Sequence, residues 1–345
     1  MIVINKKLKF SYKDPPLLIA EISGNHNQSK TKFLKLIDSA FKNGADLVKI
    51  QTYEPKDITL NKKSEDFKIK DGIWKNNYLW DLYKKAHTPF KWHKEAFKVA
   101  KKNKGIIFSS PFSFRGVDFL EKLNVKLYKI ASFEITDLKL IKYIASKKKP
   151  IILSTGIASI KEIKSAIQTI NKYHKKIILL HCVSNYPTAL KDTNISRING
   201  LKKIFKNYHI GLSDHTDNIH SSLASLPLGI VAIEKHFKLK DSDKTPDSNF
   251  SITPKKLLEL KNCTLEIFES LKKSKLPKIN SESLKLRRSI FSIRKIKKNE
   301  KINSKNIDTF RPRIGIPASD YFKILGRRAK IDIKPFTALK KNHLK

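Results

Sequence analysis

The chain has 345 residues, 40% of which are hydrophobic, so it can bury a sizeable core and is not a disordered protein. It has no apolar run near the ~20 residues that a membrane span needs, and its two cysteines exclude a disulfide framework. The formal net charge of +41 is compatible with a nucleic-acid partner, but the lysines are scattered along the chain without a nucleic-acid-binding motif, so we interpret it as a compositional bias and expect neither a nucleic-acid nor a membrane partner.

The amino terminus reads MIVINKKLKFSYKDPP. It lacks the continuous apolar stretch and the small-residue cleavage site of an export signal. Cys182 and Cys263 are the only cysteines, which is typical of a reducing compartment. We therefore expect a cytoplasmic protein.

Short apolar runs then alternate with longer segments of helical period, such as the one that places Phe33, Ile37 and Phe41 on one face. The predicted strands are residues 17–23, 46–52, 105–110, 127–132, 150–155, 176–183, 210–214 and 229–237. Strands that alternate with helices imply right-handed crossovers and a parallel sheet. Eight such units in about 270 residues predict a closed (β/α)8 TIM barrel, an α/β fold.

Polar side chains lie at the carboxyl ends of nearly all these predicted strands. In chain order they are Glu21, Lys49, Gln51, Ser109, Ser110, Lys129, Ser132, Ser154, Thr155, His181, Cys182, Ser213, Asp214, His215, Glu234 and His236. The carboxyl ends of barrel strands meet at one mouth, where such proteins place their chemistry. Because burying so many polar groups in a core would be costly, the sequence predicts a site at this mouth. Lys235 faces the helices by strand alternation, and we interpret it as a snorkelling side chain.

His215 and His236 lie on the seventh and eighth predicted strands, which are neighbours in a barrel. Two neutral imidazoles at a barrel mouth suit a divalent transition metal, with water or substrate in the remaining positions. The spacing is equally compatible with one hydrogen-bonded histidine beside a histidine that acts as a general base. His26, in the first loop near the mouth, has no assigned role.

Lys49 and Lys129 lie within strands and point inward. Hydroxyl groups are expected nearby at Ser110, Ser132, Ser154 and Ser213. Two ammonium groups with several hydroxyls favour a seat for a phosphate or a carboxylate. A lysine that forms a Schiff base, as in barrel aldolases, is the alternative.

Three carboxylates complete the predicted mouth, and they are Glu21, Glu134 and Asp247. They could handle protons or bind sugar hydroxyls. Asp247, in TPDSNFS, is also compatible with an ordinary turn residue.

The chain continues beyond a helix around residues 255–272 with KKSKLPKINSESLKLRRS, which is rich in lysine, serine and proline and predicts a linker. We assign the barrel domain to residues 1–272, the linker to 273–284 and a small β-rich domain to 285–345. A module of about 60 residues has little core of its own, so we expect it to rest on something larger.

At these positions the sequence resembles a known family. The motifs IAEISGNHNQ, GADLVKIQTY, FSSPF, YKIASFEITD, ILSTGIAS, GLSDHT and EKHF, followed by PDSNFS, resemble the sialic acid synthase family. The carboxy-terminal RRSIFSIRKIKKNEKI and FRPRIGI resemble the antifreeze-like (SAF, β-clip) domain of that family. The segments LWDLYKKAHTPFKWH and ASFEITD, with Gln28 and Ser184, resemble its pseudaminic acid synthase branch.

This resemblance implies a transferase that condenses phosphoenolpyruvate with a sugar of the 2,4-diacetamido-2,4,6-trideoxyhexose type, with an N-acetylneuraminate or legionaminate synthase as the alternative. It implies a divalent ion, Mn²⁺ first and Mg²⁺ or Co²⁺ as alternatives, held by His215 and His236. Phosphoenolpyruvate would be held by Lys49, Ser110, Lys129, Ser132, Ser154, Ser184 and Ser213. The sugar would face Gln51, Glu134, Tyr186, Asp247 and Arg311. Glu21 would take the proton of the attacking water.

The resemblance also implies a domain-swapped homodimer, in which Arg311 reaches into the partner subunit's barrel and contacts the N-acetyl group of the sugar. Two positions depart from the family pattern. Ser110 replaces a threonine and keeps the hydroxyl. Arg313 stands where the family has glycine, and a side chain there would alter the loop that carries Arg311.

Overall fold

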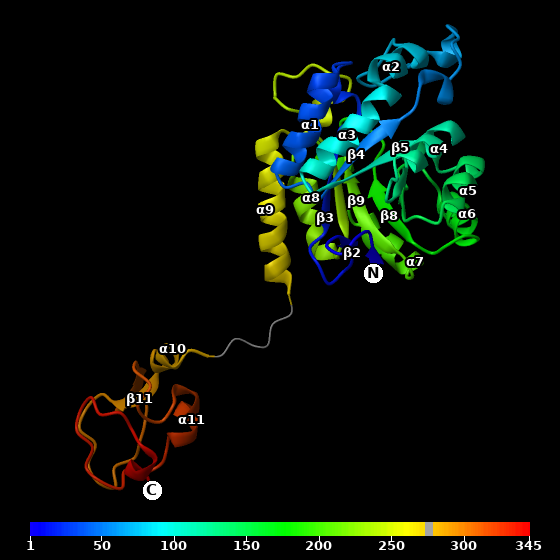
Figure 1. Cartoon of the computed structure of the whole chain (residues 1–345). Coiled ribbons are helices and arrows are strands. Elements are labelled where there is room, and N and C mark those ends of the chain that lie inside the picture. The colour runs from blue at the N-terminus through cyan, green and yellow to red at the C-terminus, as the bar shows by residue number, and fades with distance from the viewer. Residues whose placement is uncertain (273–278) are drawn as a thin grey trace. The chain divides into compact units, whose positions relative to one another are not determined.

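The computed structural model describes residues 1–272 and 279–345 (Figure 1). These residues belong to two compact units, one of residues 1–272 and a smaller one that ends at residue 345. The linker predicted for residues 273–284 begins outside the described residues, and its last part belongs to the short helix α10, Ser281–Lys285.

The first unit contains a closed barrel of parallel strands in the order β10-β3-β4-β5-β6-β7-β8-β9, which confirms the predicted fold. The strands are β3 Leu17–Glu21, β4 Leu47–Thr52, β5 Ile106–Pro111, β6 Tyr128–Ile130, β7 Ile151–Ser154, β8 Ile177–Cys182, β9 His209–Asp214 and β10 Ala232–His236. Each strand is contained in one of the predicted runs or extends beyond it by one residue. Because these strands are buried on both faces, their apolar parts read as continuous runs, as expected for a parallel sheet.

Helices alternate with the strands and form the outer layer of the barrel (Figure 1). They are α1 Lys30–Lys42, α2 Leu79–Ala86, α3 Phe90–Lys102, α4 Phe114–Lys122, α5 Leu138–Ser146, α6 Ile160–Asn171, α7 Arg197–Ile204, α8 His220–Ser225 and α9 Pro254–Leu271. Helix α6 illustrates why they form. Ser159 and Glu162 make a reciprocal capping box at its start, and Ile163, Ile167 and Ile170 bury one face against the barrel.

The amino-terminal residues form a small antiparallel hairpin of β1, Ile2–Val3, and β2, Lys9–Phe10. The Phe10 side chain is fully buried and belongs to the same hydrophobic core as the barrel strands and helices. The hairpin therefore extends the barrel unit rather than forming a separate element.

Short 3-10 helices follow several strands at the mouth of the barrel. They are η1 Ser23–His26 after β3, η4 Ser132–Glu134 after β6 and η7 Ser248–Phe250 after β10. The connection from β4 to α2 is longer and contains η2, Pro55–Asp57, and η3, Glu65–Phe67. Because the strands are parallel, all these connections lie at the same end of the barrel.

Lys235 is one residue for which the sequence interpretation is wrong. Its side chain does face away from the barrel interior, but it is fully buried instead of snorkelling to solvent. Its ammonium group lies 3.1 Å from Asp214 Oδ2 and donates to Thr216 O at 2.5 Å. The ion-pair partner on the neighbouring strand is what makes burial tolerable.

The second unit pairs β11, Ser289–Ser292, antiparallel with β12, Ile307–Phe310, and adds the one-turn helix α11, Tyr321–Ile324. It has its own small hydrophobic core. The core includes Ile290, Ile296, Ile302, Ile307, Ile316, Ile324, Ala329, Ile333, Leu339 and Leu344. This is the small β-rich fold expected for the carboxy-terminal part.

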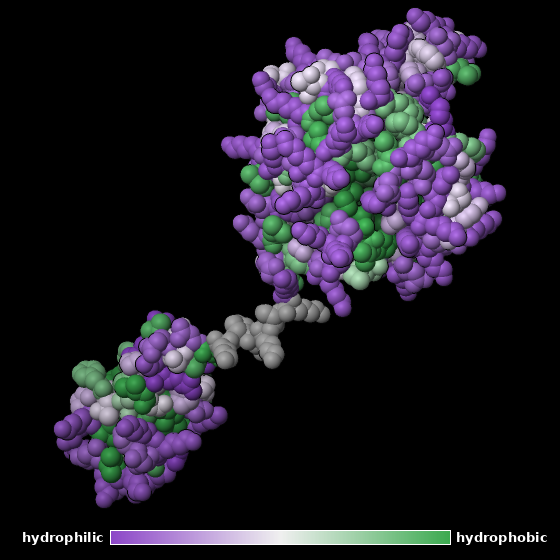
Figure 2. All heavy atoms as spheres, in the orientation of Figure 1, coloured by the Kyte–Doolittle hydropathy of each residue, from purple (hydrophilic) through white to green (hydrophobic). Residues whose placement is uncertain are grey.

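Hydrophilic side chains predominate on the visible face of each unit (Figure 2). Among the helices in residues 1–272 and 279–345, none is long and apolar enough to cross a membrane.

Candidate active site

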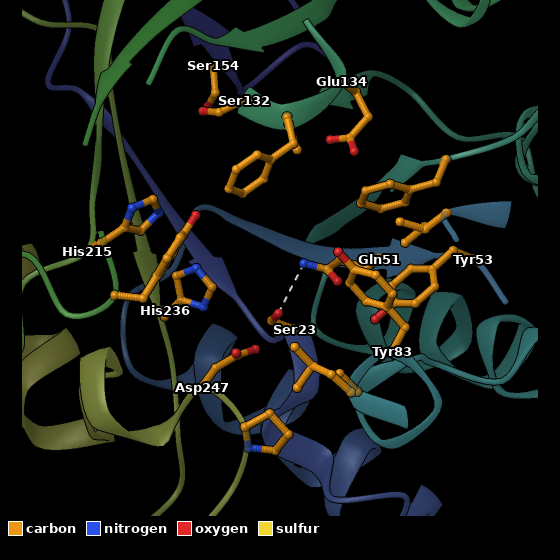
Figure 3. A pocket seen from close by; sticks show the side chains of 18 of the residues that line it. Ser23, Gln51, Tyr53, Tyr83, Ser132, Glu134, Ser154, His215, His236 and Asp247 are labelled. Atoms are coloured by element: carbon orange, nitrogen blue, oxygen red, sulfur yellow. Dashed lines mark hydrogen bonds between the residues drawn. The ribbon is translucent and has the colours of Figure 1, made fainter. Parts of the chain in front are cut away.

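A pocket of about 450 Å³ lies at the mouth of the barrel. Of the residues predicted for the site, those that line it are Lys49, Gln51, Lys129, Ser132, Glu134, Ser154, Tyr186, Ser213, His215, His236 and Asp247. Figure 3 labels seven of them, whose side chains converge from different strands and loops: Gln51, Ser132, Glu134, Ser154, His215, His236 and Asp247. Glu21, Ser110 and Ser184 do not line the pocket, and Arg311 belongs to the second unit.

His215 and His236 lie side by side at one end of the pocket (Figure 3), with their ring centroids 5.4 Å apart. Nδ1 of His215 is 2.7 Å from the carbonyl oxygen of Val183. Because a carbonyl only accepts, this nitrogen carries the proton and Nε2 keeps its lone pair. Nδ1 of His236 is buried and has no hydrogen-bond partner among the described residues.

Both imidazoles are neutral, because burial lowers the pKa of His215 to about 4 and the pKa of His236 well below its usual value. Neutral imidazole is the form that binds metal ions. Its nitrogen binds them at about 2.1 Å, so two rings on one ion stand roughly 5 Å apart. The pair therefore fits a shared divalent ion.

The two histidines are the only ligands that the described residues would offer to this ion. Across residues 1–272 and 279–345, no group of three or more His, Cys, Asp or Glu side chains is arranged to hold an ion. Water or substrate oxygens would have to complete the coordination, as in catalytic sites that keep open positions.

Two lysines and two glutamates form a buried cluster beside the histidines. Lys49 Nζ lies 2.7 Å from Glu21 Oε2 and 3.5 Å from Glu234 Oε1. Lys129 Nζ donates to both oxygens of Glu234, at 3.1 and 3.0 Å. None of the four side chains is more than 4% exposed. Their formal charges cancel, so each ammonium group is balanced by a carboxylate.

The two carboxylates of this cluster differ in their electrostatics. Burial raises the pKa of Glu21 to about 7, although Lys49 opposes the shift. Its Oε2 atom lies 2.7 Å from Lys49 Nζ, and neither Glu21 oxygen accepts any other hydrogen bond within the described part of the chain. Burial also acts on Glu234, but Lys129 and Lys49 together hold its pKa at about 2. Glu234 is thus a permanent anion, whereas Glu21 can exchange a proton near neutral pH.

Glu234 is a residue to which sequence reasoning gave no role. The signal was present, because Glu234 and His236 are two apart on one strand and face the same side. The carboxylate also accepts a hydrogen bond from Ser213 Oγ at 3.3 Å. It therefore connects the lysines to the strand that leads to His215.

Serine side chains lie around Gly156, which follows β7. The backbone N–H of Gly156 donates to Ser132 Oγ at 3.2 Å. A Cβ atom on Gly156 would lie only 2.3 Å from Ser184 Oγ, so no larger residue fits without displacing this hydroxyl. The hydroxyls of Ser110 and Ser184 are buried and have no partner among the residues that the structure describes. Neither residue lines the pocket, so these two hydroxyls lie behind its wall.

The opposite end of the pocket carries Gln51, Glu134, Tyr53 and Tyr83 (Figure 3). Gln51 donates to Ser23 Oγ at 3.0 Å, and burial raises the pKa of Glu134 to about 7.

Asp247 lies closer to the histidines (Figure 3), and Tyr186 contacts His215. Asp247 Oδ2 accepts the N–H of Gly24 at 2.9 Å, and the carboxylate is buried at the pocket wall. It is therefore more than an exposed turn residue. The ring of Tyr186 packs 4.4 Å from that of His215, measured between centroids.

An apolar wall forms much of the pocket and was missed by sequence reasoning, which followed polar residues only. It consists of Ile58, Ile69, Trp74, Leu79, Leu82, Phe112, Phe133 and Phe250. Most of these residues come from the connection after β4 and from α2. Trp74 Nε1 donates to the carbonyl oxygen of Pro246 at 2.9 Å, which joins that connection to the loop that carries Asp247. In the sequence, the aromatic residues of the connection after β4, such as Trp74, were the signal that could have indicated this wall.

Arg311 and Arg313 follow β12 in the second unit, and the contact predicted for Arg311 with a partner subunit stays a prediction. Arg313 donates its backbone N–H to Lys285 O at 2.9 Å. It does not have the positive φ that would require glycine. The departure from the family's glycine therefore introduces no backbone strain at this position.

Comparison with known proteins shows which family and which proteins this chain resembles. The SAF domain model matches residues 287–345. A protein named pseudaminic acid synthase from Helicobacter pylori is 41% identical, with 94% of this chain and 96% of that protein covered. A protein of the same name from Campylobacter jejuni is 40% identical, with 94% and 95% covered.

Relatives with other names follow. An N,N'-diacetyllegionaminic acid synthase from Campylobacter jejuni is 36% identical over 92% of this chain and 97% of its own length. The crystal structure of an N-acetylneuraminic acid synthetase from Leptospira borgpetersenii is similar with a TM-score of 0.73 at 29% identity, and covers 82% of this chain and 94% of its own. The NeuB family model matches residues 36–275, and the chain belongs to this family.

Proposed function

We propose that the protein is a pseudaminic acid synthase. It would condense phosphoenolpyruvate with 2,4-diacetamido-2,4,6-trideoxy-β-L-altropyranose and water to give pseudaminic acid and phosphate. The three relatives named pseudaminic acid synthase, at 39–41% identity over 94% of the chain, support this assignment. The observation that carries it is the neighbouring position, in one pocket, of two neutral imidazoles and two buried lysines.

His215 and His236 would hold a divalent ion, with Mn²⁺ as the first choice and Mg²⁺ or Co²⁺ as alternatives. When bound, the ion supplies Lewis acidity toward the aldehyde oxygen of the open-chain sugar. The packing of Tyr186 against His215, and of Phe250 against His236 at 4.7 Å between centroids, keeps bulk water from this end of the pocket.

Lys49 and Lys129 would hold the phosphate and carboxylate of phosphoenolpyruvate. The hydroxyl donors to the same substrate would be Ser110, Ser132, Ser154, Ser184 and Ser213. In the reaction, C3 of phosphoenolpyruvate forms a bond to the aldehyde carbon, water adds at C2, and cleavage of the C2–O bond releases phosphate. Glu234 holds the ammonium groups of Lys49 and Lys129 in position for phosphoenolpyruvate. Glu21, with its pKa of about 7, takes a proton from the attacking water.

The sugar would lie against Gln51, Glu134, Tyr186 and Asp247. These groups supply hydrogen bonds to hydroxyl and amide groups, and the apolar wall accepts methyl groups of the acetamido substituents. Small-molecule sites commonly combine an apolar lining with a few convergent polar groups in this way.

We further propose a cytoplasmic, domain-swapped homodimer with a barrel domain of residues 1–272, a linker of 273–284 and a SAF domain of 285–345. Arg311 of the partner subunit would complete the sugar site.

The test is a phosphate-release assay on the purified protein with phosphoenolpyruvate and a panel of aldoses. We expect release only when the 2,4-diacetamido-2,4,6-trideoxy sugar is present, loss of release with a chelator, and recovery with Mn²⁺. Turnover restricted to N-acetylmannosamine or to the legionaminate precursor would contradict the assignment and favour the related synthases.

A Schiff-base aldolase finds less support, because both lysines are ion-paired to buried glutamates rather than free as amines. Borohydride treatment in the presence of pyruvate tests it directly. We expect no covalent adduct by mass spectrometry.

A further inference from the structure

A second buried ion pair lies directly behind the two histidines. In the parallel pairing of β9 and β10, Glu234 is opposite Ser213 and Lys235 is opposite Asp214. Side chains alternate along a strand, so Ser213 and Glu234 face the pocket, whereas Asp214 and Lys235 face the helix layer. The next residue on each strand, His215 or His236, faces the pocket again. The ion pair thus immediately precedes both imidazoles.

All polar atoms of this pair are occupied. The three hydrogens of the Lys235 ammonium group have three acceptors: Asp214 Oδ2 at 3.1 Å, Thr216 O at 2.5 Å and Thr216 Oγ1 at 3.0 Å. Asp214 accepts the N–H of Thr216 at 2.9 Å and the hydroxyl of Ser222 at 2.6 Å. The side chains of Lys235 and Asp214 are 0% and 1% exposed.

These contacts fix the backbone on both sides of His215. Lys235, on the strand of His236, holds Asp214 before His215 and Thr216 after it. The carbonyl oxygen of Val183 accepts the Nδ1 hydrogen of His215, and the carbonyl of His215 accepts the N–H of Thr188 at 3.0 Å. The residue that bears one imidazole is therefore tied to the strand that bears the other.

Stability alone does not account for a charged pair at this position. Transferring two charges into the interior costs several kcal/mol per ion, and well-packed apolar residues of similar volume are often as stable or more so. An ion pair with defined hydrogen-bond directions does what apolar packing does not, because it sets the separation and orientation of two neighbouring strand ends.

We propose that Lys235 and Asp214 are positioning residues that set the spacing of His215 and His236 for a shared divalent ion. The inference rests on the proposed function, since it concerns the ion that the two imidazoles would hold. Groups that orient metal ligands from outside the coordination shell typically change metal affinity by about 10- to 100-fold when they are replaced.

The test is the double variant Asp214→Asn/Lys235→Met, which removes both charges without leaving one unpaired. Titration calorimetry with Mn²⁺ alone, on metal-depleted full-length protein, measures the ion affinity without turnover. We expect Mn²⁺ affinity to fall by about 10- to 100-fold. Affinity for phosphoenolpyruvate without metal should stay unchanged, and the unfolding midpoint of the metal-free protein should move by no more than about 4 °C.

A matched control is Asp46→Asn/Lys261→Met. Lys261 Nζ lies 2.8 Å from both carboxylate oxygens of Asp46, so this variant also removes one charged pair. Asp46 immediately precedes β4, at the amino end of the strands and away from the mouth. We expect its Mn²⁺ affinity to equal that of the wild type.

A milder pair of variants serves if the double variant does not fold. Thr216→Val removes one acceptor of Lys235, and Thr216→Ser keeps it. We expect weaker Mn²⁺ binding in the valine variant, with recovery in the serine variant. A folded Asp214→Asn/Lys235→Met or Thr216→Val variant that binds Mn²⁺ as tightly as the wild type overturns the inference, as does a lower unfolding midpoint with unchanged Mn²⁺ affinity. Wild-type protein that binds no divalent ion would instead refute the metal site of the proposed function.

Discussion

At the scale of single residues, the site depends on how burial changes the charge of neighbouring groups. Glu21 and Glu234 are both buried carboxylates next to Lys49, yet burial raises the pKa of Glu21 to about 7 and the two lysines hold that of Glu234 at about 2. The difference follows from Lys129, which donates to both oxygens of Glu234 only. One carboxylate can act as a base near neutral pH and the other is a fixed charge.

This contrast predicts the pH dependence of the reaction. A base must be deprotonated, so the acid limb of the pH profile of kcat/KM should be centred near pH 7. Below pH 7, kcat/KM should fall tenfold for each unit of pH. Glu21→Gln should abolish the limb and lower kcat by at least about 100-fold. Phosphate release measured from pH 5 to 9 checks both.

Glu134 also has a pKa raised by burial to about 7, so it needs a separate control. Glu134→Gln should raise the KM for the sugar and leave the limb in place. If the limb disappears in this variant and not with Glu21→Gln, the two roles must be exchanged.

Gly156 gives a second prediction at this scale. A methyl group at this position would lie 2.3 Å from Ser184 Oγ, 2.7 Å from Cys182 Sγ and 2.9 Å from Ser132 Oγ. Gly156→Ala must displace the two serine hydroxyls and the thiol. We therefore expect the KM for phosphoenolpyruvate to rise about tenfold, which corresponds to the loss of one charge-assisted hydrogen bond. The KM for the sugar should stay within twofold, as measured by steady-state kinetics.

Gly200 provides the matched control, because a Cβ there meets nothing within 4 Å. It lies inside α7, so Gly200→Ala should stabilise the protein by about 0.5–1 kcal/mol and leave both KM values unchanged. A similar rise in the KM for phosphoenolpyruvate in both variants would contradict the role of Gly156.

At the scale of elements, the regular parts of the barrel could be predicted because their signal is local. Each strand is a short apolar run that ends in polar residues, and the ends of the eight predicted runs lie within three residues of those of the observed strands. The mouth followed from this pattern, since parallel strands place their carboxyl ends together. Alternation also placed Lys235 outside the barrel, but its burial depends on Asp214 of the next strand, a contact that no local pattern contains.

The connection after β4 could not be predicted for the opposite reason. Residues 53–78 have no helical or strand period, and their position over the pocket is set by long-range contacts such as that of Trp74 with Pro246. The apolar residues of the pocket were therefore not predicted, whereas most of its polar residues were, with Ser23, Tyr53 and Tyr83 among the exceptions.

The Trp74 contact gives a prediction for this element. Trp74→Phe keeps an aromatic ring near Tyr186 and Phe250 and removes the hydrogen bond to Pro246 O. Because one such bond is worth about 0.5–1.5 kcal/mol, we expect the KM for the sugar to rise by up to about tenfold. The KM for phosphoenolpyruvate, whose proposed seat includes Lys49 and Lys129, should not change. Equal effects on both substrates would show that the connection does not border the sugar site.

At the scale of the whole molecule, the barrel unit holds the pocket, the lysines and the histidines, whereas Arg311 belongs to the second unit. The sequence could predict that both domains exist, because each carries its own motifs. It could not establish which barrel Arg311 serves, because that depends on the assembly and not on either fold. A domain-swapped dimer predicts that each site combines the barrel of one chain with Arg311 of the other.

Mixing two inactive variants tests this arrangement. Glu21→Gln and Arg311→Ala should each be inactive as homodimers, for loss of the base and of the sugar contact. In a swapped heterodimer, one barrel has Glu21 together with Arg311 from the Glu21→Gln chain, so one of its two sites is intact. Co-expressed chains that assort at random form heterodimers for half of the population and should recover about a quarter of wild-type phosphate release. If Arg311 instead served its own barrel, neither site of the heterodimer would be complete, and the mixture would stay as inactive as its parents.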